Sequence, residues 1–443
     1  MKTPASTATR LAAACALATL LSVSLPLASA DILTWDSGGL APASPNNAAG
    51  TWNLTNAYWS NGSTDSAWVN ANNDTASFGG TTAYTVTIGS GIAITAGGLT
   101  TTNAGTVTIS AGNGSSSLTL AGATPTIGGA GTFTLNIAIQ GSDGLAKTGN
   151  GTLRFNTAAT YTGNTSTSGG QIVLAAANAL PATTQLAMSN TGLVTMQNNQ
   201  SLAGLSGLST NTIRNTTASN WTLTITGGTN AFAGTLSETS TGTLALTNSG
   251  GTLALTGTNN YKGATIVSGG SLSFGSNLVN SSSVTVSGGT LTSTVANVNL
   301  GKGAVSMGSG AITPRGVGTA GTFTLDANQN FVTTGGTLNF DLVSSSNFDQ
   351  IISLGSGAFS LTGTTLALSG LTSVAGTYQL FSGFTSGSVS SLTITGLTGG
   401  YSGSLDNTGL LTVTAIPEPS TYAALAGAAI LGIAAIRRRK TRA

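Results

Sequence analysis

Apolar and polar residues alternate with a period of two along most of this chain. The alternation is clear in residues 106–109 (TVTI), 117–120 (SLTL), 132–135 (TFTL), 221–225 (WTLTI) and 284–286 (VTV). This pattern predicts short β-strands, each with one buried face and one Thr- or Ser-rich face in water. Gly-Gly, Ser-Gly and Asn-Gly pairs between the strands supply the positive φ angles of tight corners. Residues 31–415 are therefore predicted to be all-β.

Two segments of the chain, 145–174 and 242–274, repeat one pattern of glycine, leucine and tyrosine. The shared positions are Gly151, Leu153, Tyr161 and Gly163 in the first segment and Gly251, Leu253, Tyr261 and Gly263 in the second. A single unit cannot bury its apolar face alone, so such units are expected to stack into coils around one core. The pattern Gly-Thr-Leu-x-Leu, Tyr-x-Gly-x-Thr, x-Gly-Gly-x-Leu is similar to the autotransporter-associated β-strand repeat of bacterial surface passengers.

The spacing of the glycine corners predicts the architecture. Gly269-Gly270 is followed by Gly288-Gly289, a step of 19 residues that suits one coil of a right-handed parallel β-helix (β-solenoid). We predict this solenoid over residues 101–320, with Leu253, Leu255, Val267 and Leu272 pointing inward and the intervening threonines in solvent. Stacked coils place equivalent residues about 4.8 Å apart, where like charges would repel. This spacing explains why charged residues are only 5% of the chain.

A solenoid needs closed ends, because its terminal coils expose unpaired strand edges. Residues 31–100 are predicted to form a cap and the first coils, and this segment contains Trp35, Trp52, Trp59 and Trp68. We favour a buried capping core for these side chains, and the alternative is an exposed aromatic platform that binds sugars. Residues 321–415 carry longer amphipathic strands and are predicted to form a closing, sandwich-like β segment.

The two ends of the chain carry targeting signals. Residues 1–30 have a cationic start, an apolar run and the small residues Ala28 and Ala30, as in a secretory signal peptide cleaved before Asp31. At the other end, segment 416–443 contains a Pro-Glu-Pro tripeptide, an uncharged run over 420–436 that is predicted to be a single transmembrane helix, and a cationic cluster. This order resembles the PEP-CTERM sorting signal, which implies recognition and cleavage by an exosortase. The residues that carry this resemblance are Pro417, Glu418, Pro419, Arg437, Arg438 and Arg439.

Charge and composition exclude several classes of function. The formal charge of +2 comes from the two targeting segments, because residues 31–415 hold six basic and ten acidic residues, a net charge of −4. Nucleic-acid binding needs clustered Lys and Arg and is not expected. The chain has no histidine, and its single cysteine, Cys15, lies in the signal peptide. No metal site and no cofactor are therefore predicted.

Catalysis is also not expected. Polysaccharide lyases and hydrolases with this fold use clustered carboxylates, whereas only Glu238 among the acids lies between residues 144 and 325. Asp341 and Asp349 could meet across strands, but near one end of the rod. Residues 141–148 approach the phosphate-loop pattern without its second glycine or a following helix, so Lys147 is assigned to the repeat instead.

These features predict a secreted structural protein of the cell surface or extracellular matrix. Its expected partners are an exosortase, the membrane through the C-terminal helix before processing, and exopolysaccharide or other copies of itself. The main alternative is an adhesin or carbohydrate-binding surface protein. A functional amyloid and a polysaccharide-degrading enzyme are weaker alternatives.

Overall fold

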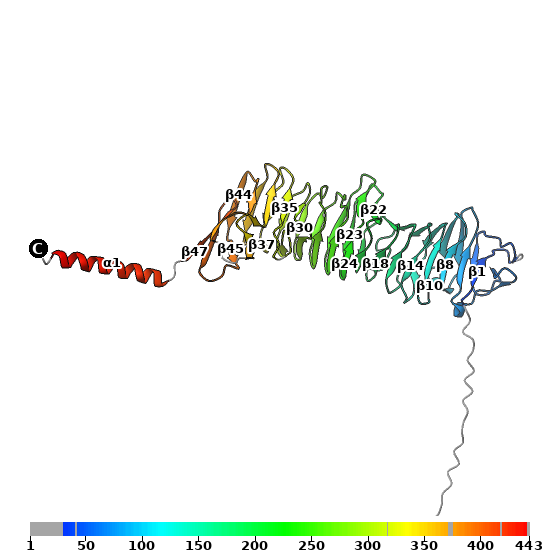
Figure 1. Ribbon diagram of the computed structural model, residues 1–443. Coiled ribbons are helices and arrows are strands. Elements are labelled where there is room, and N and C mark those ends of the chain that lie inside the picture. The colour runs from blue at the N-terminus through cyan, green and yellow to red at the C-terminus, as the bar shows by residue number, and fades with distance from the viewer. Residues whose placement is uncertain (1–29, 40–41, 317, 371–374, 417–418, 441–443) are drawn as a thin grey trace, which may run out of the picture.

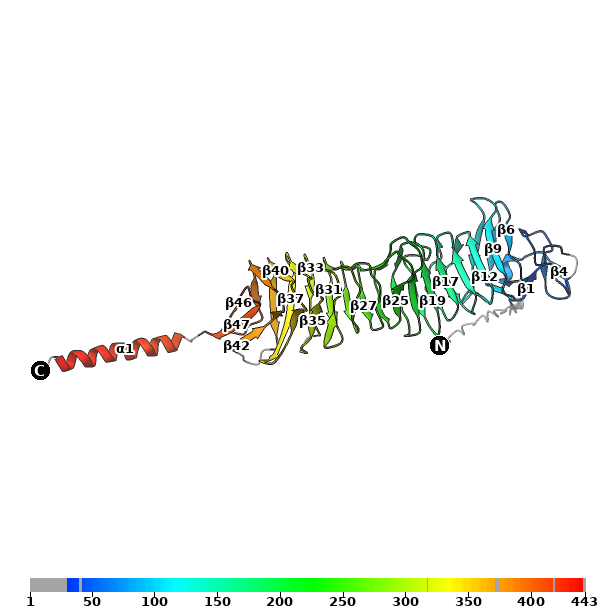
Figure 2. The same ribbon diagram turned by 90° about the horizontal axis from the view of Figure 1, so that it is seen from above.

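The protein is a long rod of stacked β-coils with one helix beyond its C-terminal end, as a computed structural model shows (Figure 1 and Figure 2). The structure describes residues 30–39, 42–316, 318–370, 375–416 and 419–440. Most of the predicted signal peptide, with Ala28, and also Pro417 and Glu418 lie outside these ranges. The predicted parallel β-solenoid is confirmed, since nearly all neighbouring strands in the long sheets pair in parallel.

Three sheets form the N-terminal half of the rod. In sheet order, the first contains β21 (Gly204–Ser206), β18 (Gln185–Met188), β16 (Thr165–Thr167), β14 (Leu145–Lys147), β11 (Thr126–Gly129), β8 (Gly98–Thr101), β5 (Thr75–Phe78), β1 (Ile32–Trp35), β3 (Trp59–Ser60) and β4 (Asp65–Ser66). The second contains β2 (Gly50–Trp52), β6 (Tyr84–Ile88), β9 (Thr106–Ala111), β12 (Thr132–Asn136), β15 (Thr152–Phe155), β17 (Gln171–Leu174), β19 (Leu193–Met196), β22 (Thr212–Asn215) and β25 (Thr235–Glu238). The short third sheet contains β13 (Ile139–Gln140), β10 (Ser117–Leu120) and β7 (Ala93–Ala96), and a 3-10 turn covers Asn70–Asn72.

Four sheets form the C-terminal half. One contains β20 (Gln200–Leu202), β23 (Trp221–Ile225), β26 (Leu244–Asn248), β28 (Thr265–Val267), β30 (Val284–Val286), β33 (Val305–Met307), β36 (Phe331–Thr333), β40 (Ala358–Thr362) and β44 (Ser386–Ser390). Another contains β24 (Thr229–Phe232), β27 (Thr252–Leu255), β29 (Ser271–Phe274), β31 (Thr290–Ser293), β34 (Ala311–Ile312), β37 (Thr337–Ser344), β41 (Thr365–Ser369) and β45 (Thr393–Thr395), with β38 (Asn347–Phe348) beside β37. The last two contain β32 (Asn297–Asn299), β35 (Thr322–Leu325), β39 (Gln350–Ser353) and β43 (Phe381–Ser382), and β42 (Gly376–Gln379), β47 (Leu410–Ala415) and β46 (Tyr401–Leu405).

The core of the rod is built from columns of stacked apolar side chains. In the strand register, Leu253 pairs with Leu272, which pairs with Leu291, and the column continues coil by coil. Leu253, Leu255, Val267 and Leu272 are all buried, so their predicted inward orientation is confirmed. Thr252 is exposed as predicted. Thr265, however, is fully buried, because its hydroxyl is hydrogen-bonded inside the rod.

The coils lengthen toward the C-terminus. One coil spans 19 residues between the paired residues Thr252 and Ser271, as the glycine corners predict. Between the paired residues Phe331 and Phe359 it spans 28. The β segment predicted over 321–415 is not sandwich-like for most of its length, because the strands from β35 to β45, apart from β38 and β42, pair in parallel and continue the coils. Within the described residues of this segment, only β42, β46 and β47 form a separate antiparallel sheet, which lies at the end of the rod.

The helix α1 (Pro419–Lys440) projects beyond the last coil (Figure 1). By length and apolarity, no helix in the described part of the chain qualifies as a membrane span, and α1 is included in that finding. The predicted C-terminal helix is confirmed, whereas its predicted role as a membrane span is not supported by this finding.

Candidate functional sites

The repeat motif builds a buried hydroxyl network inside the rod. Tyr161 is buried, and its hydroxyl lies 2.5 Å from that of Thr165, which lies 2.9 Å from the hydroxyl of Thr184 in the next coil. In the second repeat the hydroxyl of Tyr261 lies 2.7 Å from that of Thr265. Burial raises the pKa of both tyrosines. The Tyr-x-Gly-x-Thr motif thus places a satisfied polar pair in an apolar core and serves folding.

The glycines of the motif allow the backbones of successive coils to approach closely. A Cβ atom at Gly151 would lie 1.9 Å from the carbonyl oxygen of Gly131, and one at Gly251 would lie 2.2 Å from that of Gly228. Gly251 also has a φ of +64°, and Gly163 has one of +90°. At Gly263 a Cβ atom would lie 2.4 Å from the carbonyl oxygen of Leu244. Side chains are therefore excluded at these corners.

Lys147 is a buried cation held by backbone carbonyl groups. Its Nζ donates hydrogen bonds to the carbonyl oxygens of Thr148 and Gly149, at 2.8 Å and 3.0 Å. The side chain is 2% exposed, and burial lowers its pKa to about 8. These contacts close a corner of the coil, in agreement with the assignment of Lys147 to the repeat rather than to a phosphate site.

The structure brings Asp341 and Asp349 together in the interior of the protein. The backbone N–H groups of Gly321 and Asp341 donate to the carboxylate of Asp349, at 2.6 Å and 2.9 Å, and both aspartates are buried. The carboxylate of Asp341 accepts the N–H of Gly318 and the hydroxyl of Ser369. The pair therefore fixes a surface loop to strand β37 and is not open to a substrate. In the described ranges no group of three or more His, Cys, Asp or Glu residues could hold a metal ion.

This pair predicts that the C-terminal coils lose stability as the pH rises. Burial is the main reason that the pKa of Asp349 is raised to about 7, and the charge of Asp341 adds to the rise, whereas two backbone hydrogen bonds and Arg315 oppose it. The unfolded pKa is about 3.9. Between about pH 4 and pH 7, Asp349 is therefore protonated in the folded state and ionised in the unfolded state. The stability of the folded state is greatest below about pH 4 and falls as the pH approaches 7. The urea midpoint should be lower at pH 8 than at pH 5, because about two pH units of this titration lie between them, which corresponds to up to about 3 kcal/mol of local stability.

The matched control is a second aspartate that lies on the surface. Asp349→Asn should flatten the decrease in stability with pH, whereas the same change at the exposed Asp143 should leave it intact. A pH profile of the Asp349→Asn variant that matches the wild type would contradict the assignment.

The four N-terminal tryptophans form a buried cluster. Trp35, Trp52, Trp59 and Trp68 are each at most 1% exposed, and the ring of Trp59 lies 4.7 Å from that of Trp52 and 4.6 Å from that of Trp68. The indole N–H of Trp35 donates to the carbonyl of Ala48, which ties the loop after β1 to the cluster. The burial predicted for these four side chains is confirmed, as a capping core requires. The sugar-platform alternative is wrong for these rings, since their faces are covered.

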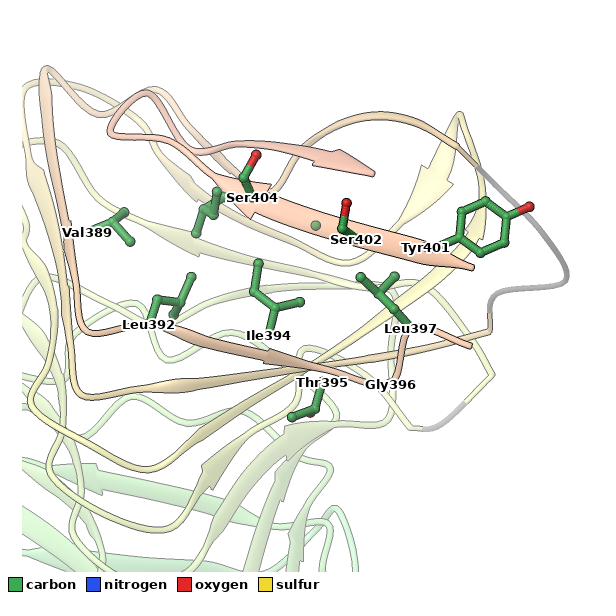
Figure 3. A pocket seen from close by; sticks show the side chains of 11 residues that line it. Val389, Leu392, Ile394, Thr395, Gly396, Leu397, Tyr401, Ser402 and Ser404 are labelled. Atoms are coloured by element: carbon green, nitrogen blue, oxygen red, sulfur yellow. The ribbon is translucent and has the colours of Figure 1, made fainter. Parts of the chain in front are cut away.

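Sequence reasoning missed an open groove at the C-terminal end of the rod. It lies between the last coil and strand β46, encloses about 550 Å³, and is shown in Figure 3. Val389, Leu392, Ile394 and Leu397 give it an apolar floor, and β46 covers them from above. Ile394 pairs with Leu366 and ends one of the core columns, so the groove is the incompletely covered end of the core. No motif indicated it, because an antiparallel strand folds back over a parallel coil there.

The fold and its tail together define an exported β-solenoid of a bacterial surface. Residues 415–440 match the PEP-CTERM protein-sorting motif, which confirms the C-terminal resemblance. The motif implies export, attachment at the cell surface and processing by an exosortase. Of its basic residues, Arg437 and Arg438 are exposed on α1, and Arg439 lies in its last turn.

A curated protein that the chain resembles is the adhesin BmaC autotransporter of Brucella suis biovar 1 (strain 1330). The two are 41% identical over 154 residues, which is 33% of this chain and 4% of the adhesin. This likeness supports a distant homology of part of the rod with an autotransporter adhesin, and the chain spans a small fraction of that relative's length. No solved structure matches the chain.

Proposed function

We infer that this protein is a non-catalytic structural rod, sorted by an exosortase and carried from the cell envelope to the cell surface or extracellular matrix. The single observation that carries this function is the joining of a long, charge-poor parallel β-solenoid to a PEP-CTERM motif. Such a rod holds its two ends far apart, and its Thr- and Ser-rich faces can meet polysaccharide or other copies of the chain without charge repulsion.

A structural role is supported by where the reactive side chains lie. The acids Asp341 and Asp349 are buried and hydrogen-bonded, and Lys147 is enclosed by carbonyl groups. The residues that line the C-terminal groove include no acid and no base. None of these places offers the pair of accessible carboxylates that glycoside hydrolysis requires.

Processing near Pro417 is the direct test of this function. The extracellular form is expected to lack the tail from Arg437 onward, because the helix and its cations serve to present the chain for cleavage. Intact mass spectrometry of the secreted protein measures this loss. Glu418→Ala should leave an uncut form that stays with the cell envelope.

The matched control is Glu238→Gln, which removes another glutamate from the solenoid while leaving the tripeptide intact. Secreted protein that still contains residues 437–443 would contradict the sorting function.

A second function, adhesion or carbohydrate binding, is favoured by the likeness to the BmaC adhesin. With the tryptophans buried, the binding surface on this hypothesis is the C-terminal groove, where Tyr401 borders an apolar floor and the hydroxyl groups of Ser402 and Ser404 point away from that floor (Figure 3). The apolar face of a sugar ring suits such a lining. Binding of the purified protein and of its Tyr401→Ala variant to immobilised polysaccharides distinguishes the two functions, because binding through the groove should be lost in the variant, whereas contacts along the faces of the rod should be unchanged.

A further inference from the structure

The backbone nitrogen of Asp31 lies against a buried carboxylate. Its N–H donates to Oδ1 of Asp74 at 2.8 Å, and Asp74 is 3% exposed. The carbonyl of Asp31 in turn accepts the N–H of Thr75 at 2.8 Å, so residue 31 is fixed on both sides where β1 begins to pair with β5. This contact therefore sits at the first residue of the rod.

The carboxylate of Asp74 has only uncharged partners in the described structure. Besides the Asp31 N–H, its Oδ2 accepts the side-chain amide of Asn72 at 3.3 Å. A buried carboxylate is stabilised most by a cation that also donates a hydrogen bond. Asp31 nitrogen already occupies the position that such a cation would need.

We propose that removal of the signal peptide turns this contact into an ion pair that locks the first strand. Hydrolysis of the peptide bond between Ala30 and Asp31 consumes one water, and Ala30 leaves with the new carboxylate. The nitrogen of Asp31 becomes an amine and takes up a proton, giving an ammonium group beside Oδ1 of Asp74. Ala30 and Asp31 are both exposed, so the bond is accessible.

The consequence is a rod whose N-terminal coil becomes tighter after processing than before it. In the precursor, Asp74 accepts a neutral amide, whereas in the processed chain it pairs with a full positive charge. The titratable groups at this position are the new ammonium, Asp74 and the side chain of Asp31 itself, and the neighbouring Asn72 is neutral. The inference rests on the proposed export, because that export supplies the cleavage.

The test compares three forms of the chain that differ only at the N-terminus. All run to Ala443: one starts at Asp31 with a free amine, one is the same chain with an acetylated amine, and one keeps residues 28–30. Hydrogen exchange of the β1 amides is measured at pH 6.5. The free amine should slow this exchange about tenfold relative to both other forms, which equals one pKa unit of coupling.

The effect must depend on Asp74 and on the charge of the amine. It should vanish in Asp74→Asn, persist in Asp143→Asn, and disappear above about pH 9, where an α-amine loses its proton. Equal exchange in the three wild-type forms, or a difference that survives high pH, would overturn the proposal even if Asp74→Asn failed to fold. The N-terminal mass of the exported protein is measured separately, so an export failure is recognised independently of the ion pair.

Discussion

Leu253→Asp is expected to unfold the central coils of the rod. Leu253 is 1% exposed and lies in a core column between Asn230 and Leu272 of the adjacent coils. An aspartate there would bury a charge among apolar side chains without a cationic partner, which costs several kcal/mol. Because each coil is stabilised mainly by its neighbours, the loss should spread to the coils on both sides. A large decrease in melting temperature, followed by circular dichroism, measures this effect.

The control for this substitution is the adjacent residue. Thr252 is exposed, and its neighbours in the stack, Thr229 and Ser271, carry no charge that an aspartate would repel. Thr252→Asp should therefore change the stability by no more than about 0.5 kcal/mol. Similar decreases in melting temperature for the two variants would argue against a core of stacked columns.

The sequence predicted this core because the alternation of apolar residues is local information. Strand β9 illustrates the point, since Val107 and Ile109 are buried while Thr106 and Thr108 remain partly exposed. The 19-residue coil also followed from the sequence, because closely stacked backbones demand glycine at each corner, as at Gly251. Both signals come from single residues and from short spacings along the chain.

The end of the solenoid could not be predicted in the same way. Strands β37 and β41 alternate as clearly as strands of a sandwich would, and alternation does not distinguish parallel from antiparallel neighbours. The lengthening of the coil to 28 residues lies in loops without a repeated glycine signal. The groove beneath β46 depends on this long-range pairing, so no local pattern could indicate it.

Buried polar residues are the second feature of the structure that the sequence did not predict correctly. Thr265 has the same sequence context as a solvent-facing threonine, yet it lies in the core because Tyr261 and Ser281 bond to its hydroxyl. The Asp74 contact with the Asp31 nitrogen was equally invisible, since it joins residues 43 positions apart in the chain. Polarity predicts a hydrogen-bond requirement, and only the fold reveals whether water or protein meets it.

Replacing one tryptophan of the cap should open the N-terminal end of the rod. Trp59 is fully buried and contacts Trp35, Trp52 and Trp68, with ring centroids 4.6 to 5.2 Å apart. Trp59→Ala should cost about 3–5 kcal/mol, because it removes a large side chain and leaves a cavity between rings that cannot close it. The urea midpoint measures the loss, and increased acrylamide quenching of the remaining tryptophans reports the opening.

The fifth tryptophan provides a control outside the cap. Trp221 is only partly buried and bonds to Thr217 through its indole N–H, so Trp221→Ala should cost much less than Trp59→Ala. If the four cap tryptophans instead bound sugar, Trp59→Ala would abolish polysaccharide binding while leaving the urea midpoint unchanged. Strong quenching of the wild-type cap would likewise contradict its burial. A cap is the role that the packing favours, because the first coil would otherwise expose its core and its strand edges to water.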